Sequence, residues 1–350
     1  MTAPKIVVLD GYTLNPGDLS WEELKELGEV ELYDRTPADS VVERSRDADV
    51  VLTNKVPLSA ETLEKLPKLR YIGVTATGYN VVDVKAARRR GVVVTNVPTY
   101  GTKSVAQFTF ALLLELCHRV QRHADAVRDG EWSRWKDFSF FVTDQMELDG
   151  KTLGVIGLGR IGSQVAAIGR AFGMRVVAAG GMPGAASFAR SGARTAGKAG
   201  IAAPENAGAA TPGAAGEVPR VPLHELLKTA DVVSLHCPLT PATAGLMRKE
   251  TLALMKPTAL LVNTARGGLV VDEDLAAALN EGRIAGAALD VISTEPPDPS
   301  NPLLTAKNCI ITPHMAWTTK EARRRLLEAS IENVRCFLQG KPVNVVEPQA

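Results

Sequence analysis

The chain has 350 residues, of which 45% are hydrophobic and 23% charged, with a formal net charge of +1 at pH 7. That length allows two ordinary domains. The near-neutral charge gives no electrostatic reason to bind nucleic acid or an anionic membrane, and we find neither a signal-peptide pattern nor an apolar run of about 18 residues. We therefore expect a cytoplasmic protein with no nucleic-acid or membrane partner.

Two series of short strands are predicted, separated by helical stretches. The first series is β-branched and occupies residues 5–10, 49–54, 69–74 and 92–97. A long apolar helix over 104–120 follows, for which Ser104 and Gln107 are the expected N-terminal caps. The second series occupies residues 175–179, 231–238, 259–267, 285–291 and 309–314. Alternating strands and helices of this kind predict an α/β protein with two doubly wound parallel-sheet domains.

One segment interrupts the second series. Residues from about 180 to 216 are mostly alanine and glycine with scattered proline, and they contain few large apolar groups. Such a composition cannot hold a core, so we expect a flexible surface insertion.

The sequence GLGRIG, residues 157–162, lies between an apolar strand and an amphipathic helix. It matches the dinucleotide-binding pattern G-x-G-x-x-G. Gly157 would permit the tight turn, Gly159 would let the backbone approach a pyrophosphate, and Gly162 would let helix and strand pack closely. Because a strand, helix and strand surround the motif in order, we interpret it as a binding site for NAD or NADP.

The end of the next strand usually offers Asp or Glu to the ribose 2′-hydroxyl of NAD, but here Gly180 stands in that place. Its lack of charge makes NADP admissible. Arg190, Arg194 and Lys198 in the insertion are candidates to meet a 2′-phosphate, although basic residues in such segments are more often only solvated. The choice between the two cofactors stays open.

Three polar residues follow later predicted strands, where open parallel sheets place their ligands. Arg266 has the planar donor fork that suits a carboxylate and an adjacent carbonyl oxygen. His314 is able to pass a proton near neutral pH, and Glu295 would accept a hydrogen bond from the imidazole and stabilise its protonated form. Individually each is weak; together they form an acid, an orienting partner and an anion clamp.

These motifs carry a family resemblance. The segments GKTLGVIGLGRIG, LHCPLTPATAGL, NTARGGLVVDEDLAAAL, AGAALDVISTEPP and NCIITPHMAWTTKEAR resemble, in order and spacing, the D-isomer-specific 2-hydroxyacid dehydrogenases. Within the family, ATGYNVVDV and VPTYGTKSVAQFTFALLLELC resemble D-glycerate dehydrogenases, also called hydroxypyruvate reductases. The resemblance implies hydride transfer between a nicotinamide cofactor and a small D-2-hydroxy acid or 2-oxo acid, D-glycerate and hydroxypyruvate first, with glyoxylate possible.

The resemblance also assigns residue roles. His314 would be the acid/base, Glu295 its partner and Arg266 the substrate clamp. Cofactor binding would involve Gly157, Gly159, Arg160, Ile161, Gly162, Gly180, Cys237, Pro238, Thr264, Ala265, Asp290 and His314. Thr77 and Gly78 would offer backbone amides to the substrate carboxylate. No metal ligand is implied, and the four cysteines show no metal or disulfide spacing.

At the scale of domains, the resemblance implies a flavodoxin-like substrate domain, residues 1–101 and 316–350, and a Rossmann NAD(P)-binding domain, residues 102–315. The active site would lie in the cleft between them, and a homodimer would form through the long helix and the aromatic segment after it. Two alternatives are kept: a phosphonate or formate dehydrogenase of the same fold, and a dinucleotide-sensing corepressor-like interaction protein. Glutamine beside the histidine is typical of the formate enzymes, so Glu295 argues against that version.

Overall fold

The computed structural model describes residues 3–180 and 217–347. The chain forms two compact units, one of Met1–Gly101 with Trp317–Ala350 and one of Thr102–Ala316. The predicted insertion after Gly180, including Arg190, Arg194 and Lys198, lies outside the described residues.

The first unit contains, within the described residues, a five-stranded parallel sheet in the order β2-β1-β3-β4-β5. This is the flavodoxin-like order that the family resemblance implies. Its strands are β1 Lys5–Val8, β2 Glu29–Leu32, β3 Val50–Thr53, β4 Tyr71–Val74 and β5 Val93–Thr95. Its helices are α1 Gly11–Leu14, α2 Glu22–Lys25, η1 Ala38–Ser40, α3 Val41–Ser45, α4 Ala60–Glu64, α5 Val84–Arg89 and α14 Lys320–Leu338.

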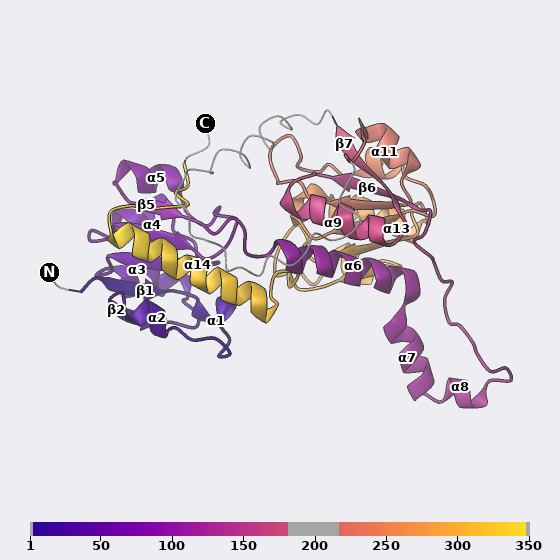
Figure 1. The fold of residues 1–350 in the computed structure, drawn as a ribbon, viewed down its shortest axis with the longest axis horizontal. Coiled ribbons are helices and arrows are strands. Elements are labelled where there is room, and N and C mark those ends of the chain that lie inside the picture. Colours follow the sequence, from indigo (N-terminus) through magenta and orange to yellow (C-terminus); the bar gives the residue numbers. More distant parts are fainter. Residues whose placement is uncertain (1–2, 181–216, 348–350) are drawn as a thin grey trace. The chain divides into compact units, whose positions relative to one another are not determined.

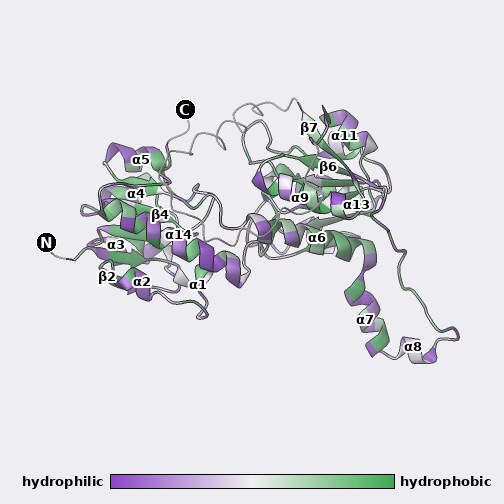
Figure 2. Cartoon of the chain, viewed as in Figure 1, coloured by the Kyte–Doolittle hydropathy of each residue, from purple (hydrophilic) through white to green (hydrophobic). Residues whose placement is uncertain are grey.

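Both faces of this sheet are covered, because successive side chains of a strand point to opposite faces. On β1, Val7 belongs to one apolar cluster, whereas Ile6 and Val8 belong to another that includes residues 326–334 of α14. Figure 2 shows α14 with hydrophilic and hydrophobic residues alternating along it, as expected for a helix with one face on a core. The C-terminal helix therefore completes the first unit's core.

The second unit contains, in its described part, a seven-stranded parallel sheet in the order β12-β11-β10-β9-β6-β7-β8. The order reverses between β6 and β9, as in the Rossmann fold, so the two predicted doubly wound sheets are confirmed. Its strands are β6 Thr152–Ile156, β7 Arg175–Gly180, β8 Arg220–Pro222, β9 Val232–Leu235, β10 Leu260–Asn263, β11 Gly286–Leu289 and β12 Cys309–Ile311. Its helices are α6 Thr102–His118, α7 Val120–Arg128, α8 Glu131–Arg134, α9 Arg160–Ala171, α11 Leu223–Thr229, α12 Lys249–Leu252, η2 Gly267–Leu269, α13 Asp272–Asn280 and η3 Pro302–Thr305.

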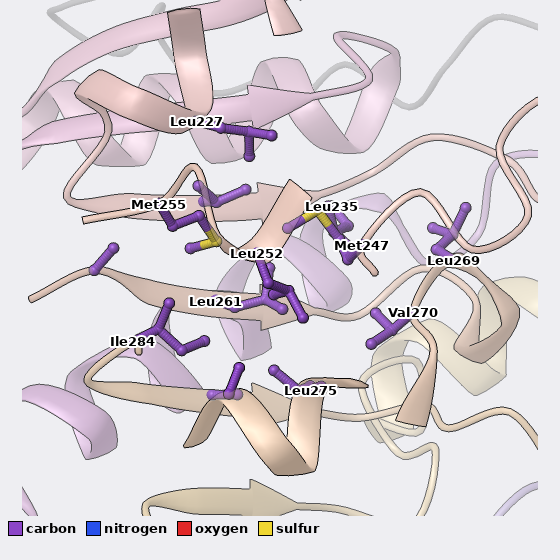
Figure 3. Close-up of a cluster of buried hydrophobic side chains, with 14 of the residues drawn as sticks. Leu227, Leu235, Met247, Leu252, Met255, Leu261, Leu269, Val270, Leu275 and Ile284 are labelled. Atoms are coloured by element: carbon purple, nitrogen blue, oxygen red, sulfur yellow. The ribbon is translucent and has the colours of Figure 1, made fainter. Parts of the chain in front are cut away.

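The central strands of this sheet are buried on both faces. Figure 3 shows one apolar cluster, in which Leu235 of β9 and Leu261 of β10 lie among side chains such as Leu252 and Leu275 from neighbouring helices. On the other face, Val155, Val232 and Val262 belong to a cluster with residues 106–117 of α6. Parallel strands covered on both sides account for the continuous apolar runs in the sequence.

The long helix α6 begins at Thr102 rather than at the predicted cap, Ser104. Ser104 lies inside the helix, and its buried hydroxyl donates to the carbonyl oxygen of Ala316 at 2.6 Å. The hydroxyl that the local pattern predicts as a helix cap therefore forms a tertiary hydrogen bond instead.

After α6, Figure 1 shows α7 and α8 extending beyond the end of that helix. The segment around α8 and after it exposes large aromatic side chains: Trp132 and Trp135 are 51% exposed, Phe141 is 73% exposed and Phe138 is 90% exposed. Exposed aromatic side chains that gather into a patch are typical of interaction surfaces. None of the described helices combines the length and apolar character needed to cross a bilayer.

Candidate active site

The turn between β6 and α9 requires its glycines. Gly157 has a φ of +103°, and a Cβ there would lie 2.5 Å from the backbone nitrogen of Cys237. A Cβ on Gly162 would lie 2.0 Å from the carbonyl oxygen of Gly157. Both positions therefore exclude any side chain, for reasons of conformation and close packing.

Gly159 is different, because a Cβ there would meet no described atom within 4 Å. It precedes the first turn of α9, which has twelve residues and begins at Arg160. The first backbone N–H groups of a helix have no acceptor within that helix. Open space beside them fits the pyrophosphate of a dinucleotide. Arg160 is exposed and Ile161 half-buried beside this turn.

The ends of β7 and β9 carry the residues that were predicted for the adenosine side of this site. Gly180 is the last residue of β7, as predicted. Cys237 and Pro238 follow β9, and Cys237 is buried, which raises the pKa of its thiol to about 11. A thiol held in its neutral form is suited to apolar contact rather than to nucleophilic chemistry.

The loop after β10 is held by one buried amide. The side chain of Asn263 donates to the carbonyl oxygen of Arg266 at 2.9 Å and accepts from the backbone N–H of Ala265 at 3.0 Å. Thr264 shares a 3.0 Å hydrogen bond with Thr109 of α6. The half-buried Arg266 donates to the carbonyl oxygen of Ala265, and in residues 3–180 and 217–347 no carboxylate forms an ion pair with it.

A second buried group, Asp290, organises the turn after β12. Its carboxylate accepts from the Thr312 hydroxyl at 2.7 Å and from the backbone N–H groups of Met315 and Ala316, each at 2.8 Å. Desolvation raises the pKa of this carboxyl above its usual range. The carbonyl oxygen of Asp290 accepts from the N–H of His314 at 2.9 Å.

The structure brings together the side chains of His314 and Glu295, which were named as partners from the sequence. The Nδ1 atom of His314 lies 2.6 Å from the Oε2 atom of Glu295, while Oε1 of Glu295 accepts from the N–H of Ile292 at 3.3 Å. The side chains are 28% and 34% exposed, so a solute is able to reach the imidazole. With Nδ1 engaged by the carboxylate, Nε2 is left for a reacting group.

In the first unit, Thr77 and Gly78 follow the carboxyl end of β4. The Thr77 hydroxyl donates to the carbonyl oxygen of Val97 at 3.0 Å, and its own carbonyl oxygen accepts from the Asn96 side chain at 2.7 Å. These bonds hold the loop at the sheet edge where parallel sheets bind their ligands.

The model of the D-isomer specific 2-hydroxyacid dehydrogenase NAD-binding domain matches residues 110–203 and 207–316, which is more than half of the chain. The chain belongs to this family. It is therefore an NAD(P)-dependent dehydrogenase, and the matched range includes the dinucleotide turn, Arg266, Glu295 and His314.

Relatives of this dehydrogenase align along nearly its whole length. It is 48% identical to the hydroxypyruvate reductase of Blautia hydrogenotrophica, over 98% of this chain and 99% of that protein. It is 37% identical to the glycerate dehydrogenase of Methylorubrum extorquens, over 98% and 99%. Among solved structures, the NADPH-dependent glyoxylate/hydroxypyruvate reductase of Sinorhizobium meliloti, in complex with NADP and malonate, has a TM-score of 0.77 and 26% identity, with all of both chains covered.

Several positions of the dehydrogenase site were not predicted. Asn263 and Thr312 hold the loops that carry Arg266 and His314, and Asp290 was assigned only to the cofactor, not to the turn of His314. A polar residue at the end of an apolar strand is the signal that could have marked Asn263. Within the part of the chain that the structure describes, no three His, Cys, Asp or Glu side chains gather as a possible metal site.

Proposed function

We propose that this dehydrogenase interconverts hydroxypyruvate and D-glycerate, with glyoxylate as a second substrate. The observation that carries the proposal is the His314–Glu295 pair, which follows strands of the same parallel sheet as the dinucleotide turn and the Arg266 loop. The activities named for the relatives in Blautia, Methylorubrum and Sinorhizobium support the choice of substrate.

In the direction of reduction, we assign each group one role. The bound dinucleotide would supply the hydride for the carbonyl carbon. His314 donates the proton from Nε2 to the carbonyl oxygen, and Glu295 holds the ring through Nδ1 and stabilises its positive charge before transfer. Arg266 binds the substrate carboxylate and carbonyl oxygen through its two-pronged donor fork, and the amides of Thr77 and Gly78 bind the carboxylate.

We further propose that the enzyme acts as a cytoplasmic homodimer. The aromatic segment after α7 supports self-association, because Trp132, Trp135, Phe138 and Phe141 are large apolar side chains that are more than half exposed within one short segment.

The substrate proposal is tested with a panel of 2-oxo acids, hydroxypyruvate, glyoxylate, pyruvate and phenylpyruvate, assayed with NADH and with NADPH by nicotinamide absorbance. We expect the highest kcat/KM for hydroxypyruvate and a lower one for glyoxylate. A higher kcat/KM for pyruvate or phenylpyruvate would refute the substrate assignment, and no turnover with any acid would refute the reductase itself.

A histidine pair supplies the matched control for the mechanism. His314→Gln removes the proposed proton donor, so kcat should fall by at least about 100-fold. His224 is exposed on α11, and we expect His224→Gln to retain wild-type kinetics. Equal kinetics in the two variants would remove His314 from the chemical step.

A further inference from the structure

Strand β8 brings a basic residue beside Gly180. Arg220 is the first residue of β8, which pairs in parallel with β7 at the edge of the described sheet. Its register partner is Ala178, two residues before Gly180, the last residue of β7. A Cβ built on Gly180 would lie 3.2 Å from the Cβ of Arg220. The Arg220 side chain therefore leaves the sheet on the side to which a residue at position 180 would direct its own side chain.

The side chain of Arg220 is exposed, and among the described residues it makes neither a hydrogen bond nor an ion pair. A carboxylate at position 180, the usual residue in NAD sites, would form an ion pair with it at this distance. Gly180 has no side chain, so the guanidinium faces no such partner.

We propose that Arg220 binds the 2′-phosphate of NADPH and thereby sets the cofactor choice of this dehydrogenase. The proposal rests on the proposed function only in using the same dinucleotide site. Position 180 is where the adenosine ribose is recognised in dinucleotide-binding sheets, and an arginine stem is long enough to carry its guanidinium past the strand end to a phosphate on that ribose.

Binding of two fragments tests this without turnover. Adenosine 2′,5′-bisphosphate carries the additional phosphate, and adenosine 5′-monophosphate lacks it; both affinities are measured by calorimetry. We expect the wild type to prefer the bisphosphate. Arg220→Ala and the longer Arg220→Gln should each weaken bisphosphate binding by about tenfold or more and change monophosphate binding by less than about twofold.

Arg283 offers a matched control, because it is exposed and precedes β11 at the amino end of the same sheet, opposite the ligand edge. Arg283→Ala should leave the affinities for both fragments as in wild type. Three outcomes would overturn the proposal: no preference in the wild type, no loss in the Arg220 variants, or an equal loss for both fragments. Hydroxypyruvate reduction by the wild type with NADH, measured separately, keeps failure of this proposal distinct from failure of the proposed function.

Gly180→Asp gives an independent test. The new carboxylate would pair with Arg220 and repel the phosphate, while its oxygen would be able to bond the ribose 2′-hydroxyl. The 3.2 Å contact is with the Cβ of Arg220, so the backbone of β8 must give by a few tenths of an ångström. We expect the ratio of kcat/KM with NADPH to that with NADH to fall by at least about tenfold; an unchanged ratio would place position 180, and Arg220 with it, away from the ribose.

Discussion

His314 has a left-handed backbone conformation, with a φ of +53°. Such a conformation is costly for a residue with a side chain and persists only where the surroundings impose it. Here the Asp290 carboxylate accepts from the Thr312 hydroxyl and the N–H of Met315, and its carbonyl oxygen accepts from the N–H of His314 itself. These bonds fix the backbone that carries the imidazole, as positioned proton transfer requires.

At Arg266, the proposed role depends on a planar fork rather than on charge alone. We predict that Arg266→Lys lowers kcat/KM for hydroxypyruvate by about 10- to 100-fold, because an ammonium group cannot bond the carboxylate and the carbonyl oxygen together. Steady-state kinetics should show a lower kcat as well as a higher KM. Wild-type values in this variant would contradict the assignment.

At Glu295, the prediction concerns the position of the imidazole. The carboxylate lies 2.6 Å from Nδ1 of His314 and holds the ring for proton transfer from Nε2. We predict that Glu295→Gln lowers kcat for hydroxypyruvate by about tenfold or more, as measured by steady-state kinetics. The exposed Glu225 on α11 supplies the control, since Glu225→Gln should retain wild-type kinetics. A wild-type kcat in Glu295→Gln would contradict the pairing.

At the scale of elements, an ion pair adds to the apolar packing of α14 within the first unit. Arg323, which is 8% exposed, donates to both carboxylate oxygens of Asp18 at 2.7 and 2.8 Å. The same guanidinium donates to the carbonyl oxygens of Leu14 and Thr318. Its bonds to Asp18 lower the pKa of that carboxyl to about 2. Removing the acid would leave a largely buried cation without its counter-ion.

We predict that Asp18→Asn lowers the Tm at pH 6 and that the gap to wild type closes in acid. Because folding lowers the pKa of Asp18, its stabilisation is complete above the unfolded value and is lost as the pH falls through about 2. Thermal unfolding followed by circular dichroism from pH 6 to pH 2 measures the gap. A constant gap over this range would show that the ionised carboxylate is not what stabilises α14.

At the scale of the whole molecule, the aromatic segment tests the proposed dimer. Phe138 and Phe141 are the most exposed of its aromatic side chains. We predict that the double change Phe138→Ser and Phe141→Ser lowers the mass in solution from dimer to monomer, as measured by light scattering. Leu304→Ser, at an exposed apolar residue of η3, should not change it. A monomeric wild type, or a dimeric double variant, would refute the proposal.

The sequence alone predicted the features that depend on local patterns. Apolar runs of strand length, helical periodicity and the spacing of Gly157, Gly159 and Gly162 specify two parallel sheets and a dinucleotide turn, because backbone propensity and glycine's conformational freedom act over a few residues. The order of the motifs also indicated the family. The catalytic and substrate-binding roles of Arg266, Glu295, His314, Thr77 and Gly78 stay predictions.

The tertiary structure decided what depends on distant segments meeting. Glu295 reaches the imidazole, and Asp290 holds the turn of His314, only because β11 and β12 lie side by side in register. Ser104 donates across the unit rather than capping its own helix. Arg220 stands beside Gly180 only through the pairing of β7 with β8, which the sequence separates by a long insertion. Strand register is a property of the packed sheet, so no local pattern could predict the contact of Arg220 with Gly180 or the bonds of Asp290 to the turn of His314.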